Sequence, residues 1–174
     1  MEIRQELPVK LITGIMYQNA RGCEQAVKAL MEQYGDIEKC TPELDFSFTN
    51  YYEEEMGTGL RKIFCSFVEP IDPNQLIDIK IYTNTLEERW LQNGKRTVNI
   101  DPGYIHPAKL VLATTKDFAH RVLLGRGIYG DVHLTWHGQG FQATPWTYPD
   151  YQLPVPMQFF IDVRNNFLQQ LPKS

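Results

Sequence analysis

Apolar residues near the start of the chain follow two different patterns. Residues 10–17 form a short, mostly apolar run, which is typical of a buried strand. The next segment repeats apolar side chains every three or four positions, the period of a helix with one buried face. These side chains are Cys23, Ala26, Val27, Leu30, Met31 and Tyr34. Because Gly35 follows, the patterns predict an amphipathic helix that ends there, with Cys23 on its core face.

The remaining segments predict further strands and two more helices. Extended segments are expected at 36–40, 44–48, 61–68, 97–101, 109–115 and, as one or two strands, 121–140. Asp72 and Pro73 suit the N-cap and first position of a helix reaching residue 91, although the apolar alternation at 77–81 leaves a strand open there. A proline-rich, irregular stretch at 146–156 precedes a closing amphipathic helix at 157–171.

The order of these elements defines the expected fold class. Over residues 10–101 it is strand-helix-strand-strand-helix-strand, which matches the ferredoxin-like arrangement. We therefore expect an α+β fold with a ferredoxin-like core, added antiparallel strands and a C-terminal helix. The length of 174 residues, with no linker, predicts a single domain over residues 1–174.

Composition narrows the class of protein. With 43% hydrophobic and 22% charged residues, the chain resembles an ordinary folded globular protein. Every apolar stretch is shorter than the ~18 residues of a membrane span, and acids in the first residues are untypical of a secretory signal. The three cysteines include no C-x-x-C pair, so we expect reduced thiols and neither a disulfide framework nor a zinc site. These features predict a soluble cytoplasmic protein with no membrane partner.

Charge is unevenly distributed along the chain. The net charge is −4, but residues 80–126 carry eight basic residues against four acidic ones. A basic segment of this kind favours a site for a phosphate or carboxylate, and the alternative is a solvated strand face. The acidic pI of about 5.6 argues against nucleic-acid binding, which needs a basic surface.

Several familiar motifs are absent from the sequence. The Gly-Lys pair is followed by Arg96, so no P-loop is present. Lys116 and Asp117 are adjacent, which breaks the spacing of the guanine-reading N/T-K-x-D element. His133 begins the H-x-[ST] element of a two-histidine phosphoesterase, but the second element is missing, and glycines near His137 disfavour a helical metal pair. No G-x-S-x-G elbow occurs, and no motif in the sequence identifies a set of metal ligands.

Candidate chemistry concentrates in residues 94–131. Strand alternation places Asn99 and Asp101 on one face and the apolar residues between them on the other. In a cleft, Asp101 would accept a proton or hold Mg²⁺, and Asn99 would orient a ligand. The alternative is that Asp101 only caps a sharp turn expected at residues 102–103.

A second group of candidates follows the strand at 109–115. One helical turn would bring Lys116 and His120 together, with Asp117 and Arg121 paired beside them. Such a turn would bind an anion, together with Lys109 at the start of the strand. The alternative is an exposed, salt-bridged turn that contributes at most ~1 kcal/mol.

Several strings together resemble a known family. They lie at 51–57, 80–87, 98–104, 109–121, 127–129 and 145–151. In these segments the chain resembles the uncharacterised bacterial family of domain of unknown function 4416, and the resemblance spans roughly residues 8–170. It implies no established activity.

The resemblance also groups residues that lie on one face of the expected helix at 72–91. Lys80, Asn84 and Glu87 are spaced as neighbours on a helix and would form a polar cleft wall, or else a solvated face. The aromatic stretch 146–151 is expected to pack against the body of the protein, and the alternative is a rigid lid.

The first functional hypothesis is an enzyme or binding protein for a small phosphorylated or nucleotide-like ligand. Asp101 with Glu55 would be its acid/base or metal pair, and His120 completes the candidate catalytic set. The candidate ligand-binding residues are Lys80, Asn84, Asn99, Lys109, Lys116 and Arg121. The expected partner is therefore a small anionic ligand, while cofactor and oligomeric state stay open.

The second hypothesis is a non-catalytic interaction module whose polar cluster faces a partner protein. An enzyme should bring the candidate residues into one concave pocket. A module should spread them over a flat surface beside an apolar patch. RNA binding is disfavoured because no aromatic-rich RNP string is present.

Overall fold

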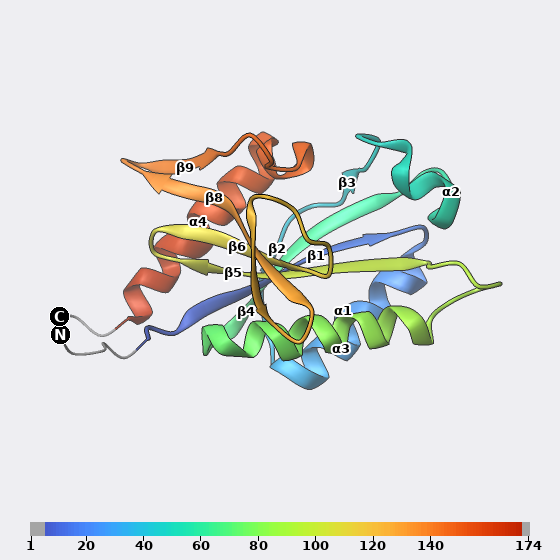
Figure 1. Cartoon of the computed structure of the whole chain (residues 1–174), viewed down its shortest axis with the longest axis horizontal. Coiled ribbons are helices and arrows are strands. Elements are labelled where there is room, and N and C mark those ends of the chain that lie inside the picture. The colour runs from blue at the N-terminus through green and yellow to red at the C-terminus, as the bar shows by residue number, and fades with distance from the viewer. Residues whose placement is uncertain (1–5, 172–174) are drawn as a thin grey trace.

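The computed structural model describes residues 6–171 and is organised around one antiparallel sheet (Figure 1). Its strands run in the order β2-β4-β1-β5-β6-β8-β7, with β3 paired to β4 and β9 paired to β8. The strands are β1 (Val9–Tyr17), β2 (Ile37–Cys40), β3 (Leu44–Asp45), β4 (Arg61–Ile71), β5 (Val98–His106), β6 (Lys109–Thr114), β7 (Arg121–Gly125), β8 (Ile128–His137) and β9 (Gly140–Ala143). The helices are α1 (Ala20–Tyr34), α2 (Glu53–Met56), α3 (Leu76–Arg89) and α4 (Pro154–Gln170), with short 3-10 helices η1 (Asn50–Tyr52), η2 (Pro73–Gln75) and η3 (Pro149–Gln152).

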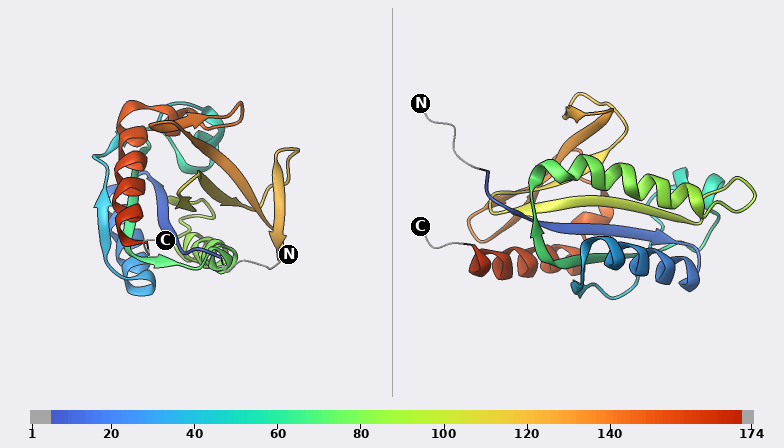
Figure 2. Two further views of the ribbon diagram at one scale, coloured as in Figure 1. Left: turned by 90° about the vertical axis from the view of Figure 1, so that its left-hand side faces the viewer. Right: turned by 90° about the horizontal axis from the view of Figure 1, so that it is seen from below.

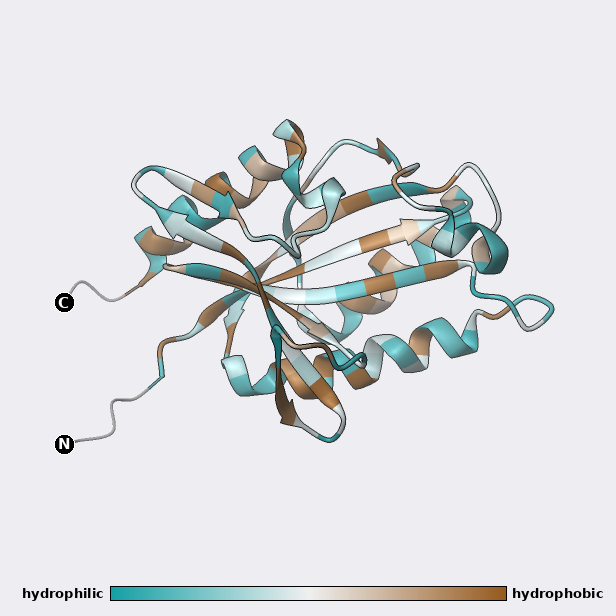
Figure 3. Ribbon diagram, turned by 45° about the horizontal axis from the view of Figure 1, so that its top comes forward, coloured by the Kyte–Doolittle hydropathy of each residue, from teal (hydrophilic) through white to brown (hydrophobic). Residues whose placement is uncertain are grey.

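Helices cover both faces of the sheet, as the two views in Figure 2 show. On β1, Leu11 and Ile15 belong to the core that α1 and α3 complete, whereas Ile12 belongs to the core that α4 completes. This alternation follows from the two-residue period of a strand buried on both sides. Apolar and polar residues accordingly mix along the helices and strands (Figure 3). The α+β class and the C-terminal helix are confirmed.

Helix α1 ends at Gly35 as its sequence predicts, and it begins after Asn19, a cap that the sequence analysis did not name. The Asn19 side chain accepts a hydrogen bond from the Gly22 amide, and Gly35 follows the last turn with φ of 86°. Cys23 packs against the core but is only half-buried, and burial raises the pKa of its thiol. Met31, expected on the buried face, is 37% exposed, because it lies at the edge of the apolar stripe.

Residues 77–81, whose apolar alternation also allowed a strand, belong to helix α3. A capping box starts η2, which leads directly into α3: Asp72 accepts from the Asn74 amide while the Gln75 side chain accepts from the Asp72 amide. Leu76, Ile79 and Leu86 are buried on one face, the spacing of a helix and not of a strand.

Strand β5 continues through Pro102 and Gly103, where a sharp turn was expected. Both residues pair with β1, so Asp101 caps no turn. Pairing with β6 begins only at Gly103, and a Cβ there would lie 2.4 Å from the carbonyl oxygen of Val111. Glycine is therefore needed at position 103 because β6 approaches so closely. Pro102 has no N–H to donate to a neighbouring strand, and it lies just before the part of β5 that pairs with β6.

The prediction of reduced cysteines is wrong for two of the three. Cys40 of β2 and Cys65 of β4 are cross-strand partners and form a disulfide, while Cys23 is a free thiol. The two cysteines are 25 residues apart in sequence, and only the register of β2 against β4 brings them together. The correction removes one reason for expecting a reducing compartment.

No helix within residues 6–171 is long and apolar enough to cross a membrane.

Substituting Gly103 with alanine should destabilise the protein by about 1–3 kcal/mol, because the new Cβ has no room beside Val111. Gly140→Ala is the matched control, since nothing lies within 4 Å of a Cβ at that position. Urea unfolding measures both. Equal stability of the two variants would contradict the close approach of β5 and β6.

Candidate functional site

A cavity of about 510 Å³ opens on the α4 face of the sheet. It lies among the ends of several elements: β1, β4 and β5, the β3–η1 segment, the β6–β7 connection and the β9–η3 segment. Its aromatic lining is Phe46, Phe48, Tyr51, Tyr52, Phe118, Trp146 and Tyr148. Its charged or titratable lining is Lys62, Asp101, Lys116, His120, Arg121 and Asp150. Four of the sequence-predicted residues, Asp101, Lys116, His120 and Arg121, therefore line one cavity.

Lys62 lies at the floor of the cavity and was missed by the sequence analysis. Its side chain is 4% exposed, and its Nζ lies 2.7 Å from Asp150 Oδ2 and 3.8 Å from Asp101 Oδ2. Gly14 of β1 leaves space for it, since a Cβ there would lie 2.9 Å from Lys62 Cε. Burial of an ammonium is costly unless carboxylates compensate it, so Lys62 and Asp150 depend on each other.

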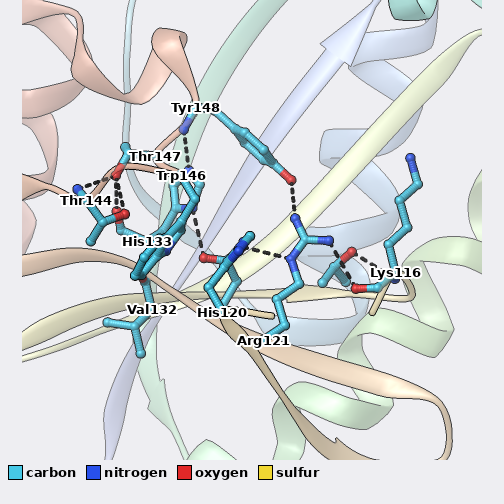
Figure 4. A network of polar contacts seen from close by, with 11 residues as sticks. Lys116, His120, Arg121, Val132, His133, Thr144, Trp146, Thr147 and Tyr148 are labelled. Carbon is cyan, nitrogen blue, oxygen red and sulfur yellow. Dashed lines mark hydrogen bonds and ion pairs between the residues drawn. The ribbon is translucent and has the colours of Figure 1, made fainter. Parts of the chain in front are cut away.

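Asp131 of β8 supports the part of the cavity wall that the β6–β7 connection forms, and its neighbours His120, Arg121 and His133 are labelled in Figure 4. Its carboxylate lies 3.0 Å from Arg121 Nε, 3.2 Å from His133 Nδ1 and 3.3 Å from His120 Nε2. Burial would raise the pKa of Asp131, but the hydrogen bonds from His133 and Arg121 and the positive charge of Arg121 outweigh it and lower that pKa. The Arg121–Asp131 pair replaces the expected Arg121–Asp117 pair, because the β7–β8 register places Arg121 opposite Asp131.

Arg121 joins two segments of the cavity wall. Its Nη1 donates to the Lys116 carbonyl oxygen at 3.0 Å, and its Nη2 donates to Tyr148 Oη at 3.1 Å. The chain from Lys116 to His120 forms no helical turn, contrary to expectation. The Arg121 guanidinium instead holds the β6–β7 connection by its hydrogen bond to the backbone carbonyl of Lys116.

His133 holds the aromatic stretch 146–151 and is buried away from the cavity. Its Nε2 accepts from the Tyr148 amide at 2.9 Å, and its carbonyl oxygen accepts from Thr147 Oγ1 at 2.6 Å (Figure 4). Because Nε2 is an acceptor, Nδ1 donates to Asp131. The stretch thus packs on β8, as expected, while Trp146 and Tyr148 also line the cavity.

His120 is held by stacking. Its ring is nearly parallel to Trp146 at 4.7 Å and to Phe118 at 6.1 Å between centroids. Nε2 is buried and makes no hydrogen bond within the described residues, although Asp131 is close. An imidazole in this position beside a carboxylate has the composition of an acid/base pair.

Lys116 differs from the other cations of the cavity. Its Nζ donates to Tyr51 Oη at 2.6 Å and lies 4.4 Å from the centre of the same ring. It makes no ion pair with the part of the chain that the structure describes. Lys62 and Arg121, in contrast, each have a carboxylate partner.

Glu55 lies outside the cavity, which corrects its expected pairing with Asp101. Arg96 donates to both of its oxygens at 2.6 Å, and this hydrogen bonding lowers the pKa of Glu55. Arg96 also donates to Asn99 Oδ1, and Asn99 Nδ2 donates to Asp101 Oδ2 at 3.0 Å. Asn99 therefore orients Asp101, while Glu55 reaches that residue only through two intermediate side chains.

Lys80, Asn84 and Glu87 were expected to form a polar cleft wall on α3, but none of them lines the cavity. Lys80 and Glu87 instead bind the backbone of β5. Lys80 Nζ donates to the Ile100 carbonyl oxygen at 3.2 Å, and Glu87 Oε1 accepts from the Ile100 amide at 2.6 Å. These side chains occupy the place where β6 has not yet begun to pair with β5. Asn84 lies half-buried on the same helix, and Lys109 lies at the far end of β6, so neither lines the cavity.

Within residues 6–171, no group of three or more His, Cys, Asp or Glu side chains is arranged to hold a metal ion. The metal alternative for Asp101 with Glu55 accordingly has no geometric support among the described residues.

The fold and the cavity define an α+β protein with an aromatic, charge-bearing cavity on one face of an antiparallel sheet. A family model described as "Domain of unknown function (DUF4416)" matches residues 7–167. The chain belongs to this family, which confirms the resemblance found in its sequence. Searches of curated proteins and of solved structures give no match.

Replacing Asp131 with asparagine should change how stability depends on pH. Because folding lowers the pKa of Asp131, its ionised form stabilises the fold above its unfolded pKa of ~4, and this contribution is lost as pH falls through the folded pKa. Asp131→Asn should lower stability by about 1–3 kcal/mol at pH 7 and reduce the further loss below pH ~4.

Thermal unfolding between pH ~3 and pH ~7 measures this effect. Asp117→Asn is the control, since that carboxylate is exposed and makes no ion pair with the described residues. Parallel pH profiles for wild type and Asp131→Asn would contradict the proposed anchoring role.

Proposed function

We propose that the cavity binds a small phosphorylated or nucleotide-like ligand, with a planar ring among the aromatic side chains and an anionic group at Lys116. The observation that carries this proposal is the ammonium of Lys116, which stands among aromatic rings without a carboxylate partner in the described chain. Whether the bound ligand is also transformed is a separate question, for which His120 beside Asp131 is the candidate acid/base group.

The aromatic lining supports binding of a ring. Tyr51 and Phe118 are 59% and 56% exposed, which is unusual for large aromatic side chains that serve only packing. Stacking of a nucleic-acid base on such a side chain contributes ~1–3 kcal/mol and tolerates different bases. The cavity volume of about 510 Å³ falls within the range of small-molecule sites.

The charges support a single anionic group. Asp150 pairs with Lys62, and Asp131 pairs with Arg121, so these two cations are already compensated. A monophosphate or carboxylate can pair with Lys116 alone, whereas a triphosphate would need several cations or a metal ion. This charge balance favours a monophosphate over ATP or GTP.

We also propose a specific topology for the core of the fold. The strand order β2-β4-β1-β5, with α1 and α3 packed on one face, supports a ferredoxin-like core extended by β6 to β9. A cytoplasmic location stays a prediction from the sequence.

Lys116→Ala should weaken binding of adenosine 5′-monophosphate by about tenfold or more, because it removes a charge-assisted contact. Lys28→Ala is the control, since Lys28 is a 79% exposed lysine on α1. Isothermal titration calorimetry at fixed ionic strength measures both variants. The proposal fails if wild-type protein binds none of adenosine monophosphate, ribose 5-phosphate and inorganic phosphate, or if Lys116→Ala binds them unchanged.

A second candidate function, self-association, is favoured by β7. This strand pairs with β8 on one side and with no other strand of the described chain, and Val122, Leu123 and Leu124 are 69%, 58% and 42% exposed. Unprotected apolar edge strands pair with other strands. The partner we propose is a second copy of this chain, since apolar residues symmetric about Leu123 suit antiparallel pairing across a two-fold axis.

Leu123→Lys should keep the protein monomeric at concentrations where wild type dimerises, because a charge on an edge strand opposes pairing. Leu168→Lys, at a 37% exposed leucine on α4, is the control. Light scattering across a concentration series measures the mass. A wild-type protein that stays monomeric throughout would exclude this second candidate.

A further inference from the structure

The floor of the cavity carries recognition groups that the binding of a ring and an anion leaves unused. We infer that Lys62, Asp101 and Asp150 form a subsite for two neighbouring hydroxyl groups, so that the ligand contains a phosphorylated sugar of the ribose type. This inference rests on the proposed function and names the ligand class for the same cavity.

The first support is unused hydrogen-bonding capacity in a buried place. Asp150 is 3% exposed, and its Oδ2 lies 2.7 Å from Lys62 Nζ, while its Oδ1 accepts no hydrogen bond from the described residues. Asp101 accepts from Asn99 through Oδ2, and its Oδ1 accepts from none of the described residues. Buried acceptors normally have donors, so these oxygens are suited to a donor from a ligand.

The second support is the chemistry of the three groups. Carboxylates only accept hydrogen bonds, and an ammonium only donates them. Two neighbouring hydroxyls can donate one proton to each carboxylate and accept from Lys62. A ligand amine would also donate to the carboxylates, but the ammonium of Lys62 between them would repel its positive charge. The subsite is therefore better matched to hydroxyls than to an amine.

The third support is the surface around the floor. The ring of Phe46, which lines the cavity, lies 5.5 Å from Lys62 Nζ, so an apolar ring borders the polar groups. A sugar has both kinds of surface, hydroxyl edges and C–H faces, and the C–H faces suit contact with aromatic rings. Lys116 lines the same cavity, so one ligand carrying a phosphate and a diol can engage both ends.

This chemistry is shared by free ribose 5-phosphate and by nucleoside 5′-monophosphates. Calorimetry with wild-type protein should therefore compare adenosine 5′-monophosphate, its 2′,3′-dideoxy analogue and ribose 5-phosphate. The dideoxy analogue should bind about tenfold or more weakly than the parent, because the buried carboxylates lose their donors. Tighter binding of adenosine monophosphate than of ribose 5-phosphate indicates a nucleotide, and the reverse order indicates a sugar phosphate.

Variants separate the subsite from the anion contact. Asp101→Asn should reduce the preference for the parent over the dideoxy analogue, whereas Lys116→Ala should weaken both and leave their ratio unchanged. Asp117→Asn, at an exposed carboxylate in the β6–β7 connection, should change neither. Because Asp101 is half-buried, circular dichroism should first show that Asp101→Asn is folded.

The outcomes distinguish the two proposals. Equal affinity for adenosine monophosphate and its dideoxy analogue would overturn the diol subsite and leave the proposed function intact. Absence of binding by every phosphorylated probe would overturn both. If Asp101→Asn fails to fold, the dideoxy comparison on wild-type protein still decides the inference.

Discussion

The carboxylate of Asp131 is the group on which one whole side of the cavity depends. It lies within ion-pair distance of His120 and Arg121, which line the cavity, and of His133, which is buried outside it. Through Arg121 it fixes the β6–β7 connection, and through His133 it fixes the aromatic stretch that follows β9. A buried carboxylate is stable only while such donors surround it, so the burial of this one group requires the wall to keep its shape.

The opposite side of the cavity follows a different rule. Its floor belongs to β1, β4 and β5, and its charged side chains replace what would otherwise be sheet core. Gly14 has no side chain, and this leaves the space that Lys62 occupies at the floor of the cavity. The cavity is thus a region where core packing is exchanged for compensated charge, and such exchanges are common where a protein binds something.

Local patterns in the sequence were sufficient for the helices and for part of the site. The periodicity of α1 and the capping signal at Asp72 concern neighbours in the chain, and both predicted the helices correctly. Asp101, Lys116 and His120 share the cavity because β5 pairs with β6, and the β6–β7 connection begins where β6 ends. That adjacency follows from successive strands pairing in a sheet.

The features that escaped prediction depend on register and on distant segments. Lys62 and Asp150 are far apart in sequence. The only signal for a buried charge was that Lys62 shares one face of its strand with Phe64 and Ser66, which are both buried. The Cys40–Cys65 disulfide exists because β2 and β4 are aligned by one register and not another. Lys80 and Glu87 have the spacing of a cleft wall, but the delayed start of β6 pairing draws both to the backbone of β5.

That last arrangement has a consequence for how the sheet opens. The amide of Ile100 has a carboxylate of α3 as its partner, where most strand amides have a carbonyl of the next strand. Its exchange with solvent deuterium is therefore governed by movement of a helix, not by separation of strands. A single backbone site in the middle of the sheet thus reports on the attachment of α3, independently of the strand pairs on either side.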